Sequence, residues 1–118
     1  MANSAYLVNT NLFVEVVTTD TQMVNNAAYI CNGSGNLTMT LPLTATVGNL
    51  IQVTNLQNGF TIAQNAGQSI RLTTAVTTVG TGGSISSNNN GDSITIECAV
   101  ENTTWIAYAS VGNGLTIV

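Results

Sequence analysis

The chain has 118 residues, of which 44% are hydrophobic and only 5% are charged, with one basic residue, five acidic residues, no His and a formal net charge of −4. Acid–base and nucleophilic catalysis depend mainly on His, Lys and paired carboxylates, so this composition argues against an enzyme and predicts no catalytic residues and no cofactor. The lack of basic residues also argues against nucleic acid as a partner, because phosphate binding needs several Lys or Arg contacts.

The length fits one domain with a modest core. Its polar residues are mainly Thr, Asn, Ser, Gln and Gly, which predicts a neutral surface rich in hydrogen-bonding groups. Charge repulsion normally helps to keep proteins apart, and uncharged β-strands pair readily at their edges. We therefore expect the chain to associate with copies of itself. No apolar run reaches the roughly 18 residues of a membrane-spanning helix, so membrane insertion is not expected.

The first 28 residues differ from the rest of the chain. They contain a β-prone stretch followed by a polar link, and the apolar residues of that stretch are Leu12, Phe13, Val14, Val16 and Val17. Two interpretations are open: a first strand of the same sheet, or an arm that pairs with a neighbouring subunit by strand addition. We accordingly divide the chain into an N-terminal arm or first strand, residues 1–28, and a β-domain, residues 29–118.

A period of two dominates the rest of the chain. Leu37, Met39 and Leu41 alternate with Thr38 and Thr40. Further β-prone segments occupy residues 50–56, 60–64, 69–72, 75–79, 93–100 and 104–110, and turns rich in Gly and Asn separate most of them. No segment combines helical spacing with good helix formers. The pattern predicts an all-β fold, an antiparallel sandwich or jelly-roll-like domain of about 8–10 short strands with almost no helix.

Cys31 and Cys98 allow one disulfide. Cys98 is in phase with Ile94 and Ile96, which favours a small buried side chain, and Cys31 follows a similar short strand. Two buried free thiols and a bridge between two strands are both open, because the compartment is unknown. Two thiols without His offer too few ligands for a metal, so no metal site is predicted.

Three charged residues and two aromatic residues are candidates for contacts with a partner. Arg71, the one cation, is a candidate for an ion pair with Asp92 or Glu97, within the subunit or across an interface. Trp105 and Tyr108 are candidates for contact with a glycan, since aromatic rings beside amide groups suit a sugar. Burial in the core or in a subunit interface is the alternative for both rings.

A series of motifs over about residues 41–113 resembles a known family. The motifs are Leu41-Pro42, Thr46–Val53, Gly59–Ile70, Gly80–Ser87, Gly91–Ile94, Asn102–Trp105 and Ser110–Asn113. In this order they resemble a β-domain module of phage tail-fibre-like and related virion or surface proteins. The resemblance implies a β-rich, trimeric, non-enzymatic module on a virion or outside the cell. The first 28 residues lie outside it.

The leading functional hypothesis is a structural protein: a self-associating all-β subunit of an extracellular filament or fibre-like assembly, either a polymer or a closed trimer. The alternative is a tail-fibre-tip domain that binds a cell-surface glycan or receptor through its loops, especially residues 80–92. The chain starts without the basic segment and apolar block of a Sec-type signal peptide, so we expect an extracellular or virion location to be reached by another route.

Overall fold

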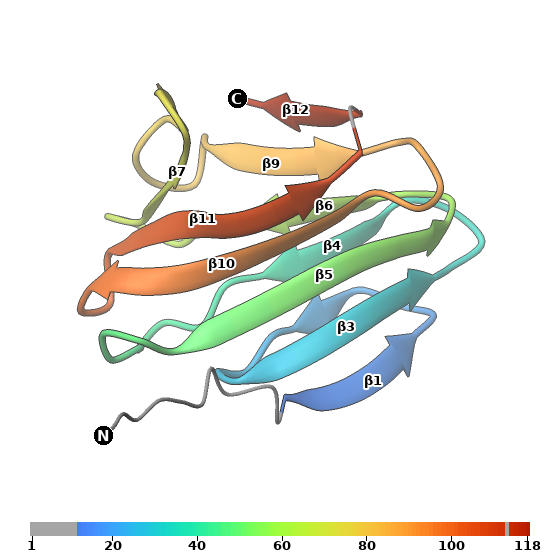
Figure 1. The fold of residues 1–118 in the computed structure, drawn as a ribbon, viewed down its shortest axis with the longest axis horizontal. Helices are drawn as coiled ribbons and strands as arrows, with labels where there is room; N and C mark the ends of the chain where they lie inside the picture. Colours follow the sequence, from blue (N-terminus) through green and yellow to red (C-terminus); the bar gives the residue numbers. More distant parts are fainter. Residues whose placement is uncertain (1–11, 113) are drawn as a thin grey trace, which may run out of the picture.

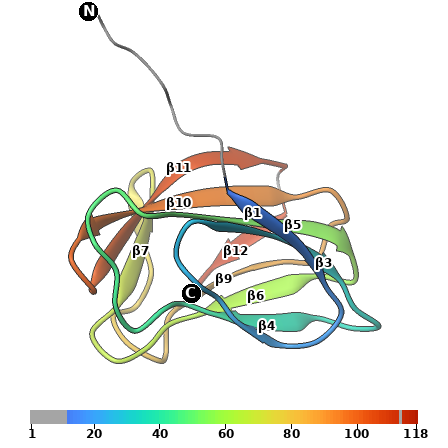
Figure 2. The same cartoon turned by 90° about the horizontal axis from the view of Figure 1, so that it is seen from below.

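The computed structural model describes residues 12–112 and 114–118, and these form two β-sheets packed face to face (Figures 1 and 2). The seven-stranded sheet has the order β1 (Phe13–Val17), β3 (Ala27–Asn32), β5 (Leu50–Gln57), β10 (Ser93–Val100), β11 (Thr104–Val111), β7 (Ser69–Leu72) and β8 (Ala75–Val76). The five-stranded sheet has the order β12 (Leu115–Ile117), β9 (Ser84–Ser87), β6 (Phe60–Ala63), β4 (Leu37–Thr40) and β2 (Thr21–Gln22).

The predicted all-β sandwich is confirmed, and the described residues contain no helix. It follows that none of the described segments is a helix able to cross a membrane. The structure has twelve strands instead of the expected eight to ten, because β2 and β9 carry few apolar residues and β12 has three residues, too few for a pattern to stand out.

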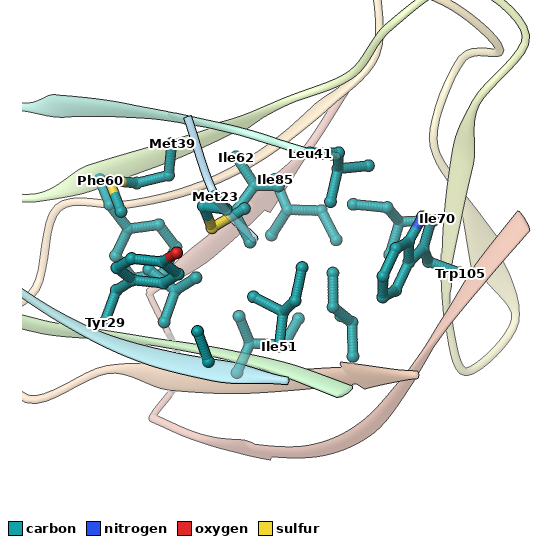
Figure 3. Packing of buried hydrophobic residues seen from close by; sticks show 14 of the residues in the cluster. Met23, Tyr29, Met39, Leu41, Ile51, Phe60, Ile62, Ile70, Ile85 and Trp105 are labelled. Carbon is teal, nitrogen blue, oxygen red and sulfur yellow. The ribbon is translucent and has the colours of Figure 1, made fainter. Parts of the chain in front are cut away.

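Alternation of side chains builds the core between the sheets. Along β5, Ile51 and Val53 are buried while their neighbours are partly exposed, and Ile94 and Ile96 repeat the pattern on β10. Full burial of one such side chain contributes about 1.5–3 kcal/mol to folding. Figure 3 shows these layers meeting between the sheets, with core residues that include Met23, Tyr29, Met39, Leu41, Phe60, Ile62, Ile70, Ile85 and Trp105.

The first half of the domain winds as a coil. Strands β1 to β6 alternate between the two sheets, and each pairs in parallel with the strand two places further along the chain: β1 with β3, β3 with β5, β2 with β4 and β4 with β6. Beyond the coil, β9 pairs antiparallel with β6 and β10 pairs antiparallel with β5. The sheets are therefore mixed, so the sandwich is as predicted but its pairing is antiparallel only in part. Each parallel connection passes through a strand of the opposite sheet, which local turn motifs do not reveal.

Buried amides fasten the loops at one end of the sandwich. The Nε2 of Gln64 donates to the carbonyl oxygens of Gln68 at 2.8 Å and Gly80 at 2.9 Å. The Nε2 of Gln68 donates to the carbonyl oxygens of Pro42 at 2.7 Å and Asn102 at 3.1 Å. Buried backbone carbonyls need partners, so two side chains replace the ladder bonds that these loops lack.

A second polar cluster lies at the opposite end. The side chain of Asn55 accepts from the Gly59 N–H at 2.9 Å and donates to the Asn89 carbonyl at 2.9 Å. The Ser87 hydroxyl donates to Asp92 Oδ2 at 2.8 Å. Asn55, Ser87 and Asp92 are all buried, so their hydrogen bonds fix the turns that follow β5 and β9.

The two cysteines are free thiols, and the disulfide alternative was wrong. Cys31 is in register with Asn55 on β5, whereas the N–H of Cys98 donates to the carbonyl of Asn49, just before β5 begins. Six residues of strand separate these two points, roughly 20 Å at about 3.3 Å per residue. A disulfide needs Cα atoms within about 7 Å. Both thiols are buried, and burial raises the pKa of Cys31 to about 11 and raises that of Cys98.

Candidate assembly surface

The β1 strand forms the outer edge of the seven-stranded sheet in the described part of the chain (Figure 1). Its parallel register with β3 places Val17, which is buried, opposite Cys31. Val14 and Val16 are 66% and 57% exposed, and Phe13 is 82% exposed. Within one chain, residues 13–17 thus form a first strand of the same sheet, as one of the two interpretations predicted. Pairing of the same residues with a neighbouring subunit stays a prediction, and residues 1–11 of the expected arm lie outside the described residues.

The main chain of β1 is oriented by its parallel ladder. The Phe13 N–H donates to the Asn26 carbonyl at 3.3 Å. In a parallel pair alternate residues direct both N–H and C=O toward the neighbouring strand, so Phe13, Glu15 and Val17 face β3. The N–H and C=O groups of Val14 and Val16 consequently point away from β3, toward the outer edge. An edge of this kind is a template for another strand.

The strands at the other ends of the described sheets are shorter. At the far side of the same sheet, β8 has two residues. In the five-stranded sheet, β2 has two residues and β12 has three. Short edge strands offer few main-chain groups and so resist strand addition. With five residues and a single charge, Glu15, β1 is the best template among these edges.

The outer face of the seven-stranded sheet is nearly neutral. Register pairing places Arg71 opposite Ile106 and Ile106 opposite Glu97, so the two charged residues lie on this face with one strand between them. At about 4.8 Å per strand their Cα atoms are roughly 10 Å apart. Other outward positions of the central strands and of β1 are uncharged, among them Val14, Val16, Ala28, Ile30, Gln52, Thr54, Ser93 and Thr95.

One of the two predicted partners of Arg71, Asp92, is buried in the structure. Asp92 is 3% exposed and its carboxylate accepts from Ser87, so it is not accessible to an interface with another subunit. Asp92 follows Gly91 in a turn, and charged residues in such turns are usually exposed, so the sequence did not indicate its burial. Arg71 is exposed on β7, and Glu97 is partly exposed on β10. A contact of these two with another subunit stays a prediction.

The structure also divides the two predicted glycan-contacting aromatics. Trp105 is fully buried, in register with Cys98 and Ile70, so a contact with a glycan was wrong for this residue. Its Nε1 is buried and has no hydrogen-bond partner among the described residues. Tyr108 is 58% exposed. The β10–β11 register shifts between Ala107 and Ala109, which makes Tyr108 the extra residue of a β-bulge.

Sequence reasoning missed a group of exposed apolar residues at one end of the sandwich. Val24, Leu43, Val47 and Val100 are each more than half exposed, at 57%, 72%, 67% and 53%. Hydrogen bonds join their loops: Asn25 to the Thr44 carbonyl at 2.9 Å, Gly48 to the Cys98 carbonyl at 2.9 Å, and Asn102 to the Ala45 carbonyl at 3.0 Å. An apolar residue inside a turn-rich loop was the available signal for Val24, Leu43 and Val47, whereas Val100 ends β10.

Across residues 12–112 and 114–118, no three His, Cys, Asp or Glu side chains are grouped as metal ligands. No known family model matches the chain, and no curated protein matches it. The likeness to phage tail-fibre modules therefore stays a prediction.

Proposed function

We propose that this protein is a non-enzymatic structural subunit that associates with copies of itself. The observation that carries the proposal is β1, a five-residue edge strand on which Phe13, Val14 and Val16 are exposed. Soluble proteins usually shorten, charge or cover such an edge, because it pairs with other chains. Here the edge carries one carboxylate, and its exposed valines would lose their contact with water on association.

The composition supports the same function. Burying an unpaired charge at an interface is costly, whereas hydroxyl and amide groups need only hydrogen-bond partners. The outer face of the seven-stranded sheet presents Gln, Ser and Thr with Arg71 and Glu97 as its charged residues. Close packing of copies on this face would bury few charges.

The larger assembly is part of the proposal. The neutral surface and the resemblance to tail-fibre modules support a filament or fibre-like assembly, extracellular or on a virion, with a closed trimer as one form. The second hypothesis, a tip domain that binds a glycan or receptor, loses Trp105 because that ring is buried. Of the two predicted contacts it retains Tyr108, so the structural role is the better supported of the two.

Sedimentation velocity over a wide range of protein concentrations tests self-association. The proposal predicts that the average mass rises above 12.2 kDa as the concentration increases. Negative-stain electron microscopy of the heaviest fraction then distinguishes filaments from closed particles. A mass that stays at that of one chain at every concentration would contradict the proposed function.

A further inference from the structure

We infer that two copies of the chain join at β1 in an antiparallel pair whose two-fold axis passes beside Val14. This inference rests on the proposed function and names the surface, the partner and the register. The partner must be a strand of similar length, because the gain in main-chain hydrogen bonds grows with the number of paired residues. Among the four strands at the ends of the described sheets only β1 has more than three residues, so a second β1 is the best match.

Side-chain direction limits the registers that are available. In a flat antiparallel junction the outward side chains of both copies must stay on the same face of the joined sheet. Val14 and Val16 face outward with Ala28 and Ile30, while Glu15 faces the other side with Val17. Only registers that place outward residues opposite outward residues are therefore allowed, and the two-fold axis must lie at a single residue of β1.

The charge on Glu15 excludes the central register. An axis at Glu15 would set the two carboxylates directly opposite each other in a closely spaced pair, and like charges in that position are destabilising. An axis at Val16 would require Thr18, which lies in a bend after the strand. An axis at Val14 instead uses Leu12, which directly precedes β1, and sets Glu15 opposite Phe13 of the second copy.

The Val14 register satisfies the outer edge of both copies. Val14 would exchange two hydrogen bonds with Val14 of the second copy, and Val16 would exchange two with Leu12 on either side of the axis. This gives about six main-chain hydrogen bonds. On the outward face Leu12, Val14 and Val16 of each copy would form one apolar row. The two seven-stranded sheets would thus become one continuous sheet.

Single cysteines along β1 test this register directly. Val14→Cys should cross-link to itself on mild oxidation, since directly opposed Cα atoms in a hydrogen-bonded pair are about 5.5 Å apart. Glu15→Cys should not cross-link, because its two copies would be offset by two residues and separated by roughly 8 Å. The native thiols give little background, as Cys31 and Cys98 are 0% and 1% exposed.

A charge variant tests the surface without a covalent bond. Val14→Lys should raise the dissociation constant by at least about tenfold, because it places two cations against each other in an apolar row. Val76→Lys is the matched control, since Val76 is 44% exposed at the opposite edge of the same sheet, and it should leave the constant unchanged. Circular dichroism should show that both variants keep the wild-type fold.

The outcomes separate this inference from the proposed function. Cross-linking of Val14→Cys together with weaker association of Val14→Lys supports the inference. A wild-type chain that associates while Val14→Lys associates equally well overturns the inference and leaves the proposed function standing. Cross-linking of Glu15→Cys in place of Val14→Cys overturns the register. A chain that stays monomeric at all concentrations overturns both.

Discussion

Two strands of the seven-stranded sheet carry a large aromatic residue, with opposite results. On β11, Trp105 is fully buried between β10 and β7. On β1, Phe13 is 82% exposed although it shares a face with the buried Val17. The difference lies in coverage: the five-stranded sheet ends at the two-residue β2 and leaves most of the inward face of β1 exposed. Residue type alone therefore does not decide burial; the reach of the opposing sheet does.

Truncating each aromatic ring should give the widest contrast. Trp105→Ala should lower the free energy of unfolding by about 3–5 kcal/mol, because it leaves a large cavity in the core. Phe13→Ala should change the value for the monomer by less than about 0.5 kcal/mol, as its ring is mostly in water. Urea denaturation at low protein concentration measures both. Equal losses in the two variants would mean that β1 is covered in solution.

Alkaline pH should lower the free energy of unfolding through the buried Cys31 thiol. The Cys31 thiol has its pKa raised from 9.0 to about 11, so the unfolded chain loses this proton at a lower pH than the folded chain. The resulting stabilisation is complete below pH 9 and is lost as the pH rises toward 11. The loss attributable to Cys31 should be about 2–3 kcal/mol. Denaturation curves for Cys31→Ala should show a shallower decline, and an unchanged slope would contradict this assignment.

The buried carboxylate of Asp92, directly before β10, offers a contrast with the partly exposed Glu97 on that strand. Asp92→Ala should cost about 1–3 kcal/mol, because the buried Ser87 hydroxyl loses its carboxylate partner. Glu97→Ala should change stability by less than about 0.5 kcal/mol. Thermal unfolding of the two variants at neutral pH provides the comparison. A larger loss of stability for Glu97→Ala than for Asp92→Ala would show that Glu97 makes a stabilising contact on the outer face.

The smallest effect concerns the one charge on β1. In the Val14 register the two Glu15 carboxylates would lie diagonally, about 7–8 Å apart, so neutralising them should strengthen association only by about two- to threefold. Sedimentation equilibrium of Glu15→Gln at low salt measures this change. Weaker association of Glu15→Gln would indicate that Glu15 makes a favourable contact across the interface.

The sequence revealed those strands whose side chains alternate clearly. Val53, Ile94 and Ile96 stand between polar neighbours, and Ile51 is in phase with Val53, so the pattern located β5 and β10. It missed β9, where Ile85 is the one large apolar residue among three serines. A strand of this kind forms because β6 and β12 pair with it on either side, and such partners are distant in the chain.

The candidate site was only partly predictable for the same reason. Residues 13–17 stood out as apolar and β-prone, but whether Phe13 would be covered depended on the length of β2. Trp105 and Tyr108 share a strand and differ in exposure because a spacing of three residues places them on opposite faces of β11, and the residue types alone do not tell which face is covered. The distance between Cys31 and Cys98 likewise follows from the parallel pairing of β3 with β5, which no local sequence motif indicates.

Hydrogen exchange at β1 reports on the pairing of two β1 strands residue by residue. The amides of Val14 and Val16 point away from β3, so in the monomer they should exchange quickly with solvent. Pairing of two β1 strands should slow exchange at these two amides as the protein concentration rises, while exchange at Val76, on the opposite edge strand, should not change. A mass that increases with concentration while the Val14 and Val16 amides exchange as fast as before would contradict it.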